Sequence, residues 1–319
     1  MRRAPVGSGR RGVALFTALW LVVAIGIVGL QFSLEARERR LAAANTVEIA
    51  QSRAAALAGV EHAQARLERL ARQLTLTGTA AAALRSQDPW LDADTLVRID
   101  ADVGGARYEV RVREIGSALN PNRATEDQLR MLFTRLGFDY GLSDQLAQCI
   151  MDWRDDDAMH RARGAEREQY VAEKRMILPR DGPLQDLSEL LHVMHMTPEI
   201  YDSIAPFLIL EGNGQINVNS APPAVLATLP GVSDATVAAV MRLRGAGRRI
   251  LTPTELRTLT GGTGPTLTTR QVGFEARSVL VTSTGWNQGG RTPVRIEAVI
   301  NRGMNTSGSV TSVVSRKTR

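Results

Sequence analysis

The sequence is poor in several residue types, and each shortage excludes something about the chain. Cys149 is its only cysteine, so an internal disulfide is excluded, and the apolar neighbours of this residue favour a buried structural thiol over a reactive one. No proline lies between Pro5 and Pro89, which leaves a long stretch without helix-breaking residues. The Gly-x-Ser-x-Gly motif, the P-loop and the dinucleotide-binding fingerprint are also absent, and nothing in the sequence therefore supports an enzyme.

Positive charge is carried almost entirely by arginine, because Lys174 and Lys317 are the only lysines in the chain. The formal net charge is +6, and only +2 remains without the four arginines that precede residue 12. Aromatic residues make up 4% of the chain and do not interleave with the basic ones. Composition therefore gives only a weak electrostatic argument for nucleic-acid binding, and we do not expect nucleic acid as a partner.

The N-terminus has a short basic leader that ends at Gly12, followed by 18 uncharged residues from Val13 to Leu30. In a secretory signal the cleavage site follows the apolar segment, whereas the only processing-like junction here, between Gly12 and Val13, precedes it. The mature chain would therefore keep the segment, which reaches the length of a membrane-spanning helix. The leader arginines predict a single-pass protein with a cytoplasmic N-terminus. An anchor that is never cleaved is the alternative.

Strong helix formers dominate beyond the apolar segment, and Leu57, Val60 and Leu67 recur at helical spacing. We therefore predict one long helix from about Val13 to about Leu76. Its first half would lie in the membrane, and its second half would pack on a soluble domain.

Strand patterns flank a long helical region. Residues 97–115 alternate as a half-exposed strand does, and residues 272–300 return to this pattern. Helix starts between them are signalled by Thr125 with Gln128, by Asp186 with Glu189, and by Thr197 before Pro198. The simplest arrangement is an α+β fold in which the outer strands pair in one antiparallel sheet against the long helix. The helical region is then an insertion, and the tail from Gly303 is expected to be loose at its end.

These patterns define the predicted domain boundaries. They are the leader, 1–12; the transmembrane part of the stem helix, 13–34; the exported part of the stem helix, 35–76; the first part of the αβ domain, 77–118; the inserted helical domain, 119–260; and the second part of the αβ domain with the tail, 272–319. Within the insertion, 119–211 carries an acidic loop and 216–260 a hairpin-like unit.

The hairpin-like unit belongs to a weak internal repeat, in which residues 119–124 resemble residues 216–221 through an Asn-x-Asn pattern. In the second copy a Pro230-Gly231 turn joins two short helices, as in a helix-hairpin-helix unit, and the glycine permits the tight backbone. Nearby basic side chains could help to hold a phosphate. They are Arg242, Arg244, Arg248 and Arg249. The alternative is a packing module that binds no nucleic acid.

Acidic residues gather after Asp152, in Asp155, Asp156 and Asp157, and Glu166 follows. Carboxylates this close repel one another unless water or a cation separates them, and oxygen-only ligands suit calcium. The spacing is not that of an EF-hand, and a solvated acidic loop is the alternative. His192 and His195 have no third zinc-type ligand near them in sequence, so we expect a surface or packing role for both.

The order of these motifs resembles the K minor pseudopilins of bacterial type II secretion systems (general secretion pathway protein K) over nearly the whole chain. The resemblance implies a type IV pilin-like fold, cleavage by prepilin peptidase after Gly12, and N-methylation of Val13. It also implies structural calcium in the globular domain and no organic cofactor. The candidate calcium ligands are Asp152, Asp155, Asp157 and Glu166.

Position five of the mature chain is Thr17, where major pilins carry a glutamate. The resemblance implies that this glutamate pairs with the terminal amine of a neighbouring subunit, since a charge buried in apolar surroundings needs a partner. A subunit without it cannot make that contact to a preceding subunit, although its own amine remains available to the next one. This arrangement fits a place at the tip of a fibre.

The resemblance further implies a non-enzymatic protein of the bacterial inner membrane, with its globular domain in the periplasm. It would cap or initiate the tip of a periplasmic pseudopilus and so support export of folded proteins across the outer membrane. Expected partners are the I, J and H minor pseudopilins, through them the major pseudopilin, the prepilin peptidase, the inner-membrane assembly platform and the exported substrates. The alternative is a membrane-anchored DNA-binding protein of competence type that uses the helix-hairpin-helix.

Overall fold

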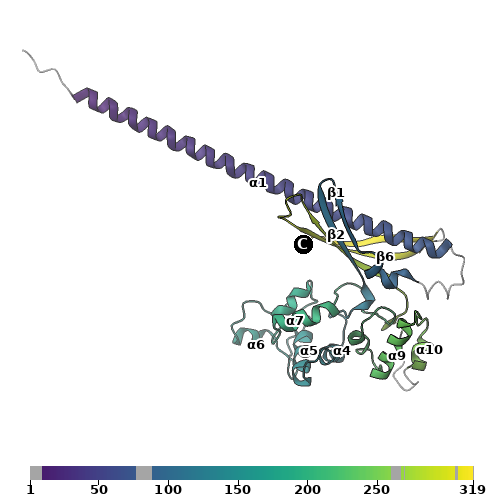
Figure 1. The fold of residues 1–319 in the computed structure, drawn as a ribbon. Coiled ribbons are helices and arrows are strands. Elements are labelled where there is room, and N and C mark those ends of the chain that lie inside the picture. Colours follow the sequence, from purple (N-terminus) through teal and green to yellow (C-terminus); the bar gives the residue numbers. More distant parts are fainter. Residues whose placement is uncertain (1–8, 77–87, 260–266, 269, 306–307, 319) are drawn as a thin grey trace, which may run out of the picture.

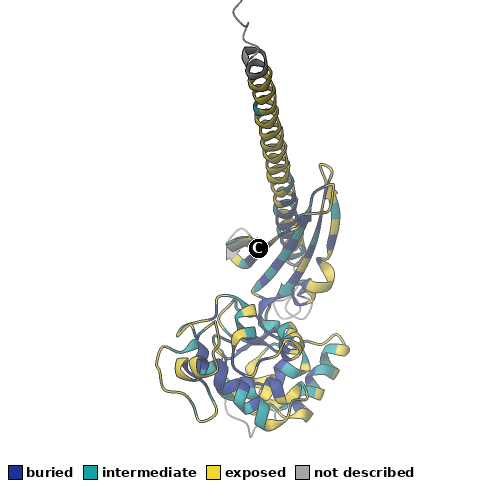
Figure 2. Cartoon of the chain, turned by 90° about the vertical axis from the view of Figure 1, so that its left-hand side faces the viewer, coloured by how far each residue is buried: buried dark blue, intermediate teal, exposed yellow. Residues whose placement is uncertain are grey.

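The structure is a computed structural model that describes residues 9–76, 88–259, 267–268, 270–305 and 308–318. A long helix, a sheet packed on the C-terminal half of that helix, and a helical domain beyond the sheet follow one another in space (Figure 1). The stem projects from one end of the molecule and the helical domain forms the other end (Figure 2).

The elements fall into two groups. The stem and sheet comprise α1 (Gly9–Leu76), η1 (Pro89–Asp92), α3 (Ala93–Leu96), β1 (Ile99–Val103), β2 (Ala106–Glu114), β5 (Ser278–Trp286), β6 (Val294–Asn305) and β7 (Gly308–Thr318). The helical domain comprises η2 (Ile115–Ser117), α4 (Glu126–Arg135), α5 (Tyr140–Arg154), α6 (Arg167–Ala172), η3 (Leu187–His192), α7 (Pro198–Ile204), η4 (Ala205–Phe207), β3 (Ile216–Asn217), α8 (Pro223–Leu226), α9 (Asp234–Gly245), α10 (Pro253–Leu259) and β4 (Val272–Gly273).

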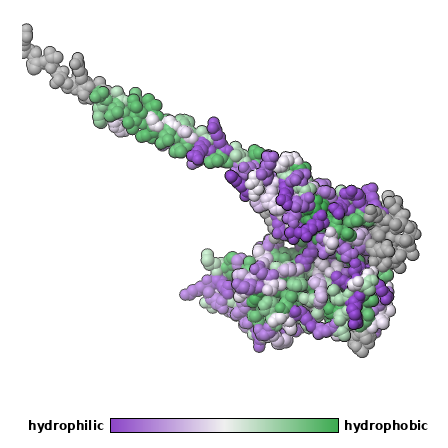
Figure 3. Space-filling model, in the orientation of Figure 1, coloured by the Kyte–Doolittle hydropathy of each residue, from purple (hydrophilic) through white to green (hydrophobic). Residues whose placement is uncertain are grey.

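The expected long helix is present as α1, which begins at Gly9, before the predicted Val13, and ends at Leu76. From Leu15 to Leu34 its large apolar side chains are exposed, and Figure 3 shows this part of the stem as mostly hydrophobic, followed by a hydrophilic patch before the sheet. Among the described residues, α1 alone is long and apolar enough to cross a membrane. Packing against other described parts of the chain does not cover these leucines and valines, and an exposed apolar surface of this size is typical of a membrane or protein contact.

The C-terminal half of α1 lies very close to the sheet because small residues face each other there. Ala56 and Ala63 are fully buried, and a Cβ atom added to Gly59 would lie 2.9 Å from the side chains of Tyr108 and Val110. A Cβ on Gly285 of β5 would overlap the backbone of α1 itself. The larger Val60 and Leu67 fill the remaining space, and burial of each contributes about 1.5–3 kcal/mol.

The sheet is antiparallel with the strand order β1-β2-β5-β6-β7, which confirms the predicted pairing of strands from before and after the helical region. Along β2 every second side chain is buried, and those from Ala106 to Val112 share one core with α1, so the alternation seen in the sequence is that of a sheet covered on one face. Because β2 pairs with β5, residues 115–277 are inserted between two neighbouring strands.

Two expectations about strands are wrong. The stretch 97–115 forms two strands and not one, because Gly104 and Gly105, with φ of +56° and +82°, turn the chain back on itself. The described end of the tail is not loose, because β7 pairs with β6 as the sheet's edge strand as far as Thr318. Thr311 of β7 is buried under Gln64 of α1, a contact that local sequence could not reveal.

The helical domain has its own core, separate from the one between α1 and the sheet. Its largest fully buried side chains include Phe133, Leu146, Ile150, Trp153 and Tyr170. The predicted helix starts are confirmed by their caps. At the start of α4, for example, the Thr125 hydroxyl accepts a hydrogen bond from the Gln128 N–H, and the Gln128 side chain accepts one from the Thr125 N–H.

Candidate functional site

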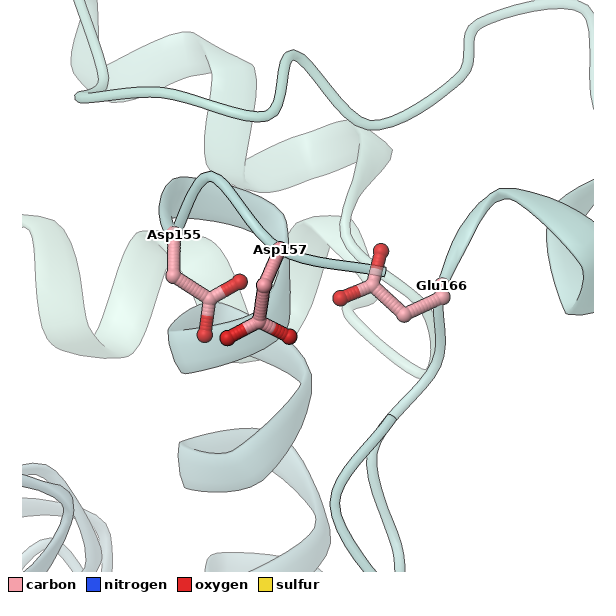
Figure 4. A group of neighbouring side chains, drawn as sticks. All are labelled: Asp155, Asp157 and Glu166. Carbon is pink, nitrogen blue, oxygen red and sulfur yellow. The ribbon is translucent and has the colours of Figure 1, made fainter. Parts of the chain in front are cut away.

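The acidic loop joins the end of α5 to the start of α6. Asp155 caps the C-terminus of α5, and Glu166 is the N-cap residue of α6. Oxygen atoms of Asp155, Asp157 and Glu166 lie within 4.8 Å of one another, and this group could hold a metal ion. Figure 4 shows the carboxylate of Glu166 extending toward Asp157, with Asp155 on the far side of Asp157.

Two oxygen atoms in this group are buried and have no hydrogen-bond partner. They are Oδ1 of Asp155 and Oε1 of Glu166. Glu166 is only 4% exposed, so water screens its charge poorly. An unpaired carboxylate oxygen in such a place costs about 1–3 kcal/mol or more, which a bound cation would offset. The donor set therefore fits a hard, oxygen-preferring cation, with the remaining ligands supplied by water or by backbone carbonyls.

The electrostatics of Glu166 point the same way. Burial, together with the negative charges of Asp152, Asp155, Asp181 and Asp157, raises the pKa of its carboxyl to about 7. The ionised form is thus unfavourable in the chain alone, because each of these neighbours repels a further negative charge. A divalent cation would reverse this balance by attracting all of the carboxylates at once.

Asp152, the fourth candidate ligand, lies beside this group but not in it. Its side chain is fully buried, and both of its oxygens already accept hydrogen bonds from Arg161. Oδ2 accepts from the main-chain N–H at 3.0 Å, while Oδ1 contacts the guanidinium. A side chain at Gly164 would collide with the same carboxylate, so the loop is closely fitted around Asp152.

The other candidate ligands stay apart from the acidic group. His192 and His195 are both exposed, and the Nε2 atom of His195 lies 2.9 Å from Nε2 of Gln145. Cys149 is fully buried, as expected, and burial raises the pKa of its thiol to about 12. In α1, Gly12 and Val13 lie in the first turns and Thr17 is exposed further along.

The hairpin-like unit has the expected form. The short helix α8 and the longer α9 are joined by a turn at Pro230 and Gly231, and the φ of Gly231 is +75°. Of the four arginines expected near it, two hold structural contacts. Arg244 donates to the carbonyls of Ser220 and Ala221, and Arg249 pairs with Asp92.

The remaining two, Arg242 and Arg248, are exposed. A phosphate-binding surface would need more free basic side chains than these. The contacts of these arginines therefore favour a packing role for the hairpin-like unit over nucleic-acid binding.

The internal repeat is far more extensive than the sequence pattern indicates. We define residues 119–209 as the first hairpin unit and residues 216–274 as the second hairpin unit. In both, an Asn-x-Asn turn leads to a helix, a left-handed glycine and a second helix whose last or second-last residue is an arginine. That arginine, Arg154 in the first unit and Arg244 in the second, donates to backbone carbonyls of its own unit's Asn-x-Asn segment.

The two hairpin units differ mainly in one place. After α9 only four residues, 246–249, separate the helix from Ile250, which binds the second unit's asparagine. After α5 the corresponding connection runs from 155 to 183 and contains the acidic loop and α6. The candidate metal site therefore lies in an insertion of the first hairpin unit. This relationship between the acidic loop and the repeat is visible only in the structure.

Comparisons with known proteins agree with this arrangement. Residues 110–211, which contain the first hairpin unit, match the family model described as type II secretion system (T2SS), protein K. Type II secretion system protein K of Klebsiella pneumoniae is 36% identical over 107 residues, which cover 31% of this chain. The match spans about a third of that relative's length, 33%.

A solved structure is also similar. It is a chain from the crystal structure of the GspK-GspI-GspJ complex from the enterotoxigenic Escherichia coli type 2 secretion system. The TM-score is 0.61 at 15% sequence identity, and the match covers 87% of this chain and 99% of that chain. At this identity the similarity concerns the fold.

Proposed function

We propose that this chain is a minor pseudopilin of the type II secretion system protein K family, a structural and non-enzymatic subunit of the type II protein secretion machinery. One combination of features supports the proposal. The segment that matches the protein K model lies largely between the paired strands β2 and β5, and the same chain carries an exposed, apolar stem helix. The subunit would cap or initiate the tip of a periplasmic pseudopilus and so support export of folded proteins across the outer membrane.

The stem would serve first as an anchor and then as an assembly surface. Before assembly, α1 would span the inner membrane once, with a cytoplasmic N-terminus and the sheet and helical domain in the periplasm. Cleavage between Gly12 and Val13 and methylation of Val13 would leave the apolar half intact. Assembly would then bury this half against neighbouring stems, a driving force that is large but not directional.

The polarity of the fibre would come from two other features. Thr17 cannot neutralise the terminal amine of a preceding subunit. The subunit's own terminal amine can still pair with the glutamate of the next subunit. The helical domain, at the opposite end of the molecule from the free half of the stem, would block further subunits above (Figure 2). In the similar solved structure the named components are GspK, GspI and GspJ, and we propose I and J pseudopilins as direct partners here.

The acidic group of Asp155, Asp157 and Glu166 would hold a calcium ion as a structural element. The ion would cross-link the end of α5 to the start of α6 and so fix the insertion of the first hairpin unit. What supports calcium is the all-oxygen donor set and the irregular loop, because calcium tolerates flexible geometry with 6–8 ligands.

Processing at the N-terminus tests the proposed function directly. The protein would be extracted from membranes of cells with and without prepilin peptidase, and its intact mass and N-terminal sequence determined. A peptidase-dependent start at methylated Val13 is the expected result. A chain that keeps residues 1–12 in both strains would contradict the pseudopilin proposal and favour a permanent anchor.

A further inference from the structure

Arg161 occupies a special place in the acidic loop, because one of its nitrogen atoms contacts two carboxylates. Nη1 donates to Oδ1 of Asp152 and, at 2.7 Å, to Oδ2 of Asp155. The other oxygen of Asp155, Oδ1, is the buried one without a partner. We propose that Arg161 is a positioning residue for the metal ion, holding Asp155 by one oxygen so that the other is presented to the ion. This inference rests on the proposed metal site.

Arg161 is itself firmly held. Its main-chain N–H donates to the fully buried Asp152 of α5, so the main chain and the guanidinium of Arg161 both contact the same carboxylate. Its Nε atom lies 3.6 Å from Oε2 of Glu126, in the first turn of α4. A side chain fixed by two helices can orient a loop carboxylate, which a freely rotating arginine could not.

Charge explains why this arginine does not replace the metal. Three carboxylates converge in Asp155, Asp157 and Glu166, whereas Arg161 contributes one positive charge, which it shares with Asp152. The contacts of Arg161 leave Oδ1 of Asp155 and Oε1 of Glu166 without partners. Arg161 therefore stabilises the loop only in part, and a second cation is needed on the other side of Asp155.

Two effects of Arg161 on metal binding oppose each other. Its charge repels a cation nearby, while its hydrogen bond fixes the carboxylate that binds the cation. Hydrogen-bonding partners of metal ligands typically contribute about 10–100-fold to metal affinity. Because Asp155 caps a helix end and its side chain is 22% exposed, it would lose its orientation without this bond. The positioning effect should therefore prevail.

The test is the affinity of the full-length chain in detergent for calcium chloride, measured by isothermal titration calorimetry. Arg161→Met should weaken calcium binding about 10–100-fold, and Arg161→Lys should recover part of the loss because an ammonium group can also bridge two carboxylates. Arg163→Met is the matched control. Arg163 is exposed in the same loop, and its Nε atom lies 3.8 Å from Asp144, outside the acidic group. Its replacement should leave the affinity within about twofold of the wild type.

A double-mutant cycle shows whether Arg161 acts through Asp155. If it does, Arg161→Met should add little to the loss caused by Asp155→Asn. A purely electrostatic effect would instead appear equally in both backgrounds and would contradict the positioning role. Unfolding is the main risk, because Arg161→Met leaves Asp152 buried and unpaired. The double variant Asp152→Asn/Arg161→Met removes both charges of that pair and should show the same weakened binding.

The outcomes separate the two proposals. A wild-type chain that binds no calcium would overturn the metal site and, with it, the role of Arg161. A wild-type chain that binds calcium, together with an Arg161→Met chain that binds as tightly or more tightly, would overturn the role of Arg161 alone.

Discussion

Asn122 and Asn219 hold equivalent positions in the two hairpin units and make the same pair of hydrogen bonds. The side chain of Asn122 donates to the carbonyl of Leu184 and accepts from its N–H, both at 2.8 Å. Asn219 does the same with Ile250, at 2.7 and 2.9 Å. Each asparagine thus closes its hairpin unit by binding the backbone of a segment at least 31 residues away. The Asn-x-Asn pattern of the sequence is a structural lock and not a ligand site.

Replacing the buried asparagine should therefore destabilise the helical domain. Asn219 is 1% exposed and also donates to the carbonyl of the half-buried Phe274, so Asn219→Ala removes the partner of two buried backbone groups of Ile250 and of this carbonyl. We expect a loss near the top of the range of about 1–3 kcal/mol, measured by denaturant unfolding. Asn122→Ala should cost less because Asn122 is half-buried. Asn213→Ala, at an exposed turn, should change stability by no more than about 0.5 kcal/mol. A loss as large as that of Asn219→Ala would contradict the structural role of the two equivalent asparagines.

The sequence predicts one half of this repeat and not the other. The Pro-Gly turn of the second hairpin unit is recognisable because Gly231 needs a positive φ and follows a proline. Gly137, with a φ of +96°, turns the chain equally tightly in the first unit, but no proline marks it. The acidic insertion after α5 also separates Leu184 from the helix pair, so the similarity of the two units is hidden in the sequence.

Candidate ligands were predictable only as far as neighbours along the chain determine them. Asp155, Asp157 and Glu166 come together because one short loop carries all three. The same spacing predicts Asp152 as a ligand, but Asp152 pairs with Arg161, a residue nine positions away whose contact depends on how the loop folds back. Local spacing cannot distinguish a carboxylate that faces a metal from one that faces an arginine.

The contact between the stem and the sheet should tolerate no side chain at Gly285. Its Cβ would overlap the backbone of Ser52 and Ala56, and a helix backbone cannot move aside as a side chain can. Gly285→Ala should therefore cost about 3 kcal/mol or prevent the sheet from docking on α1, as measured by thermal unfolding. Gly245→Ala is the control, because nothing lies near its Cβ and alanine favours helices by about 0.5–1 kcal/mol. Equal stability of the two variants would contradict this packing.

The thiol of Cys149 should be unreactive in the folded chain. The thiol is fully buried, and burial together with the nearby Asp152 raises its pKa to about 12, so little thiolate exists at pH 8. Intact mass after treatment with a maleimide should show no addition to the native chain and one addition after denaturation. A Met176→Cys variant, at a side chain that is 99% exposed, supplies the positive control. Rapid labelling of native Cys149 would show that the helical core opens easily.

Glu114 should make stability depend on pH at the junction between the sheet and the helical domain. Burial raises the pKa of its carboxyl above the ordinary value, while the hydroxyl of Ser220 donates to it at 2.5 Å. The folded chain then binds this proton more tightly than the unfolded chain. The free energy of unfolding therefore falls as the pH rises from about 4.3, the unfolded-state pKa, through the raised folded-state pKa.

Glu114→Gln removes this titration. Denaturant unfolding between pH 4.5 and 8 should show the wild type losing stability relative to the variant as the pH rises. Glu109→Gln, on the surface of the same strand, controls for the change in net charge. A difference between wild type and Glu114→Gln that stays constant over this range would mean that the buried carboxyl does not titrate there.

Calcium should stabilise the helical domain through Glu166. At a calcium concentration 100 times the dissociation constant, the stabilisation of the wild type relative to the chain in EDTA should be about 2.7 kcal/mol. Glu166→Gln removes a buried carboxylate that the neighbouring aspartates repel, so the variant should be at least as stable as the wild type in EDTA. It should gain nothing from calcium, because the ion loses its most buried ligand. Glu168→Gln, exposed on the same helix, should respond to calcium as the wild type does. If Glu166→Gln still gained stability from calcium, the ion would bind elsewhere and the acidic loop would be a solvated one.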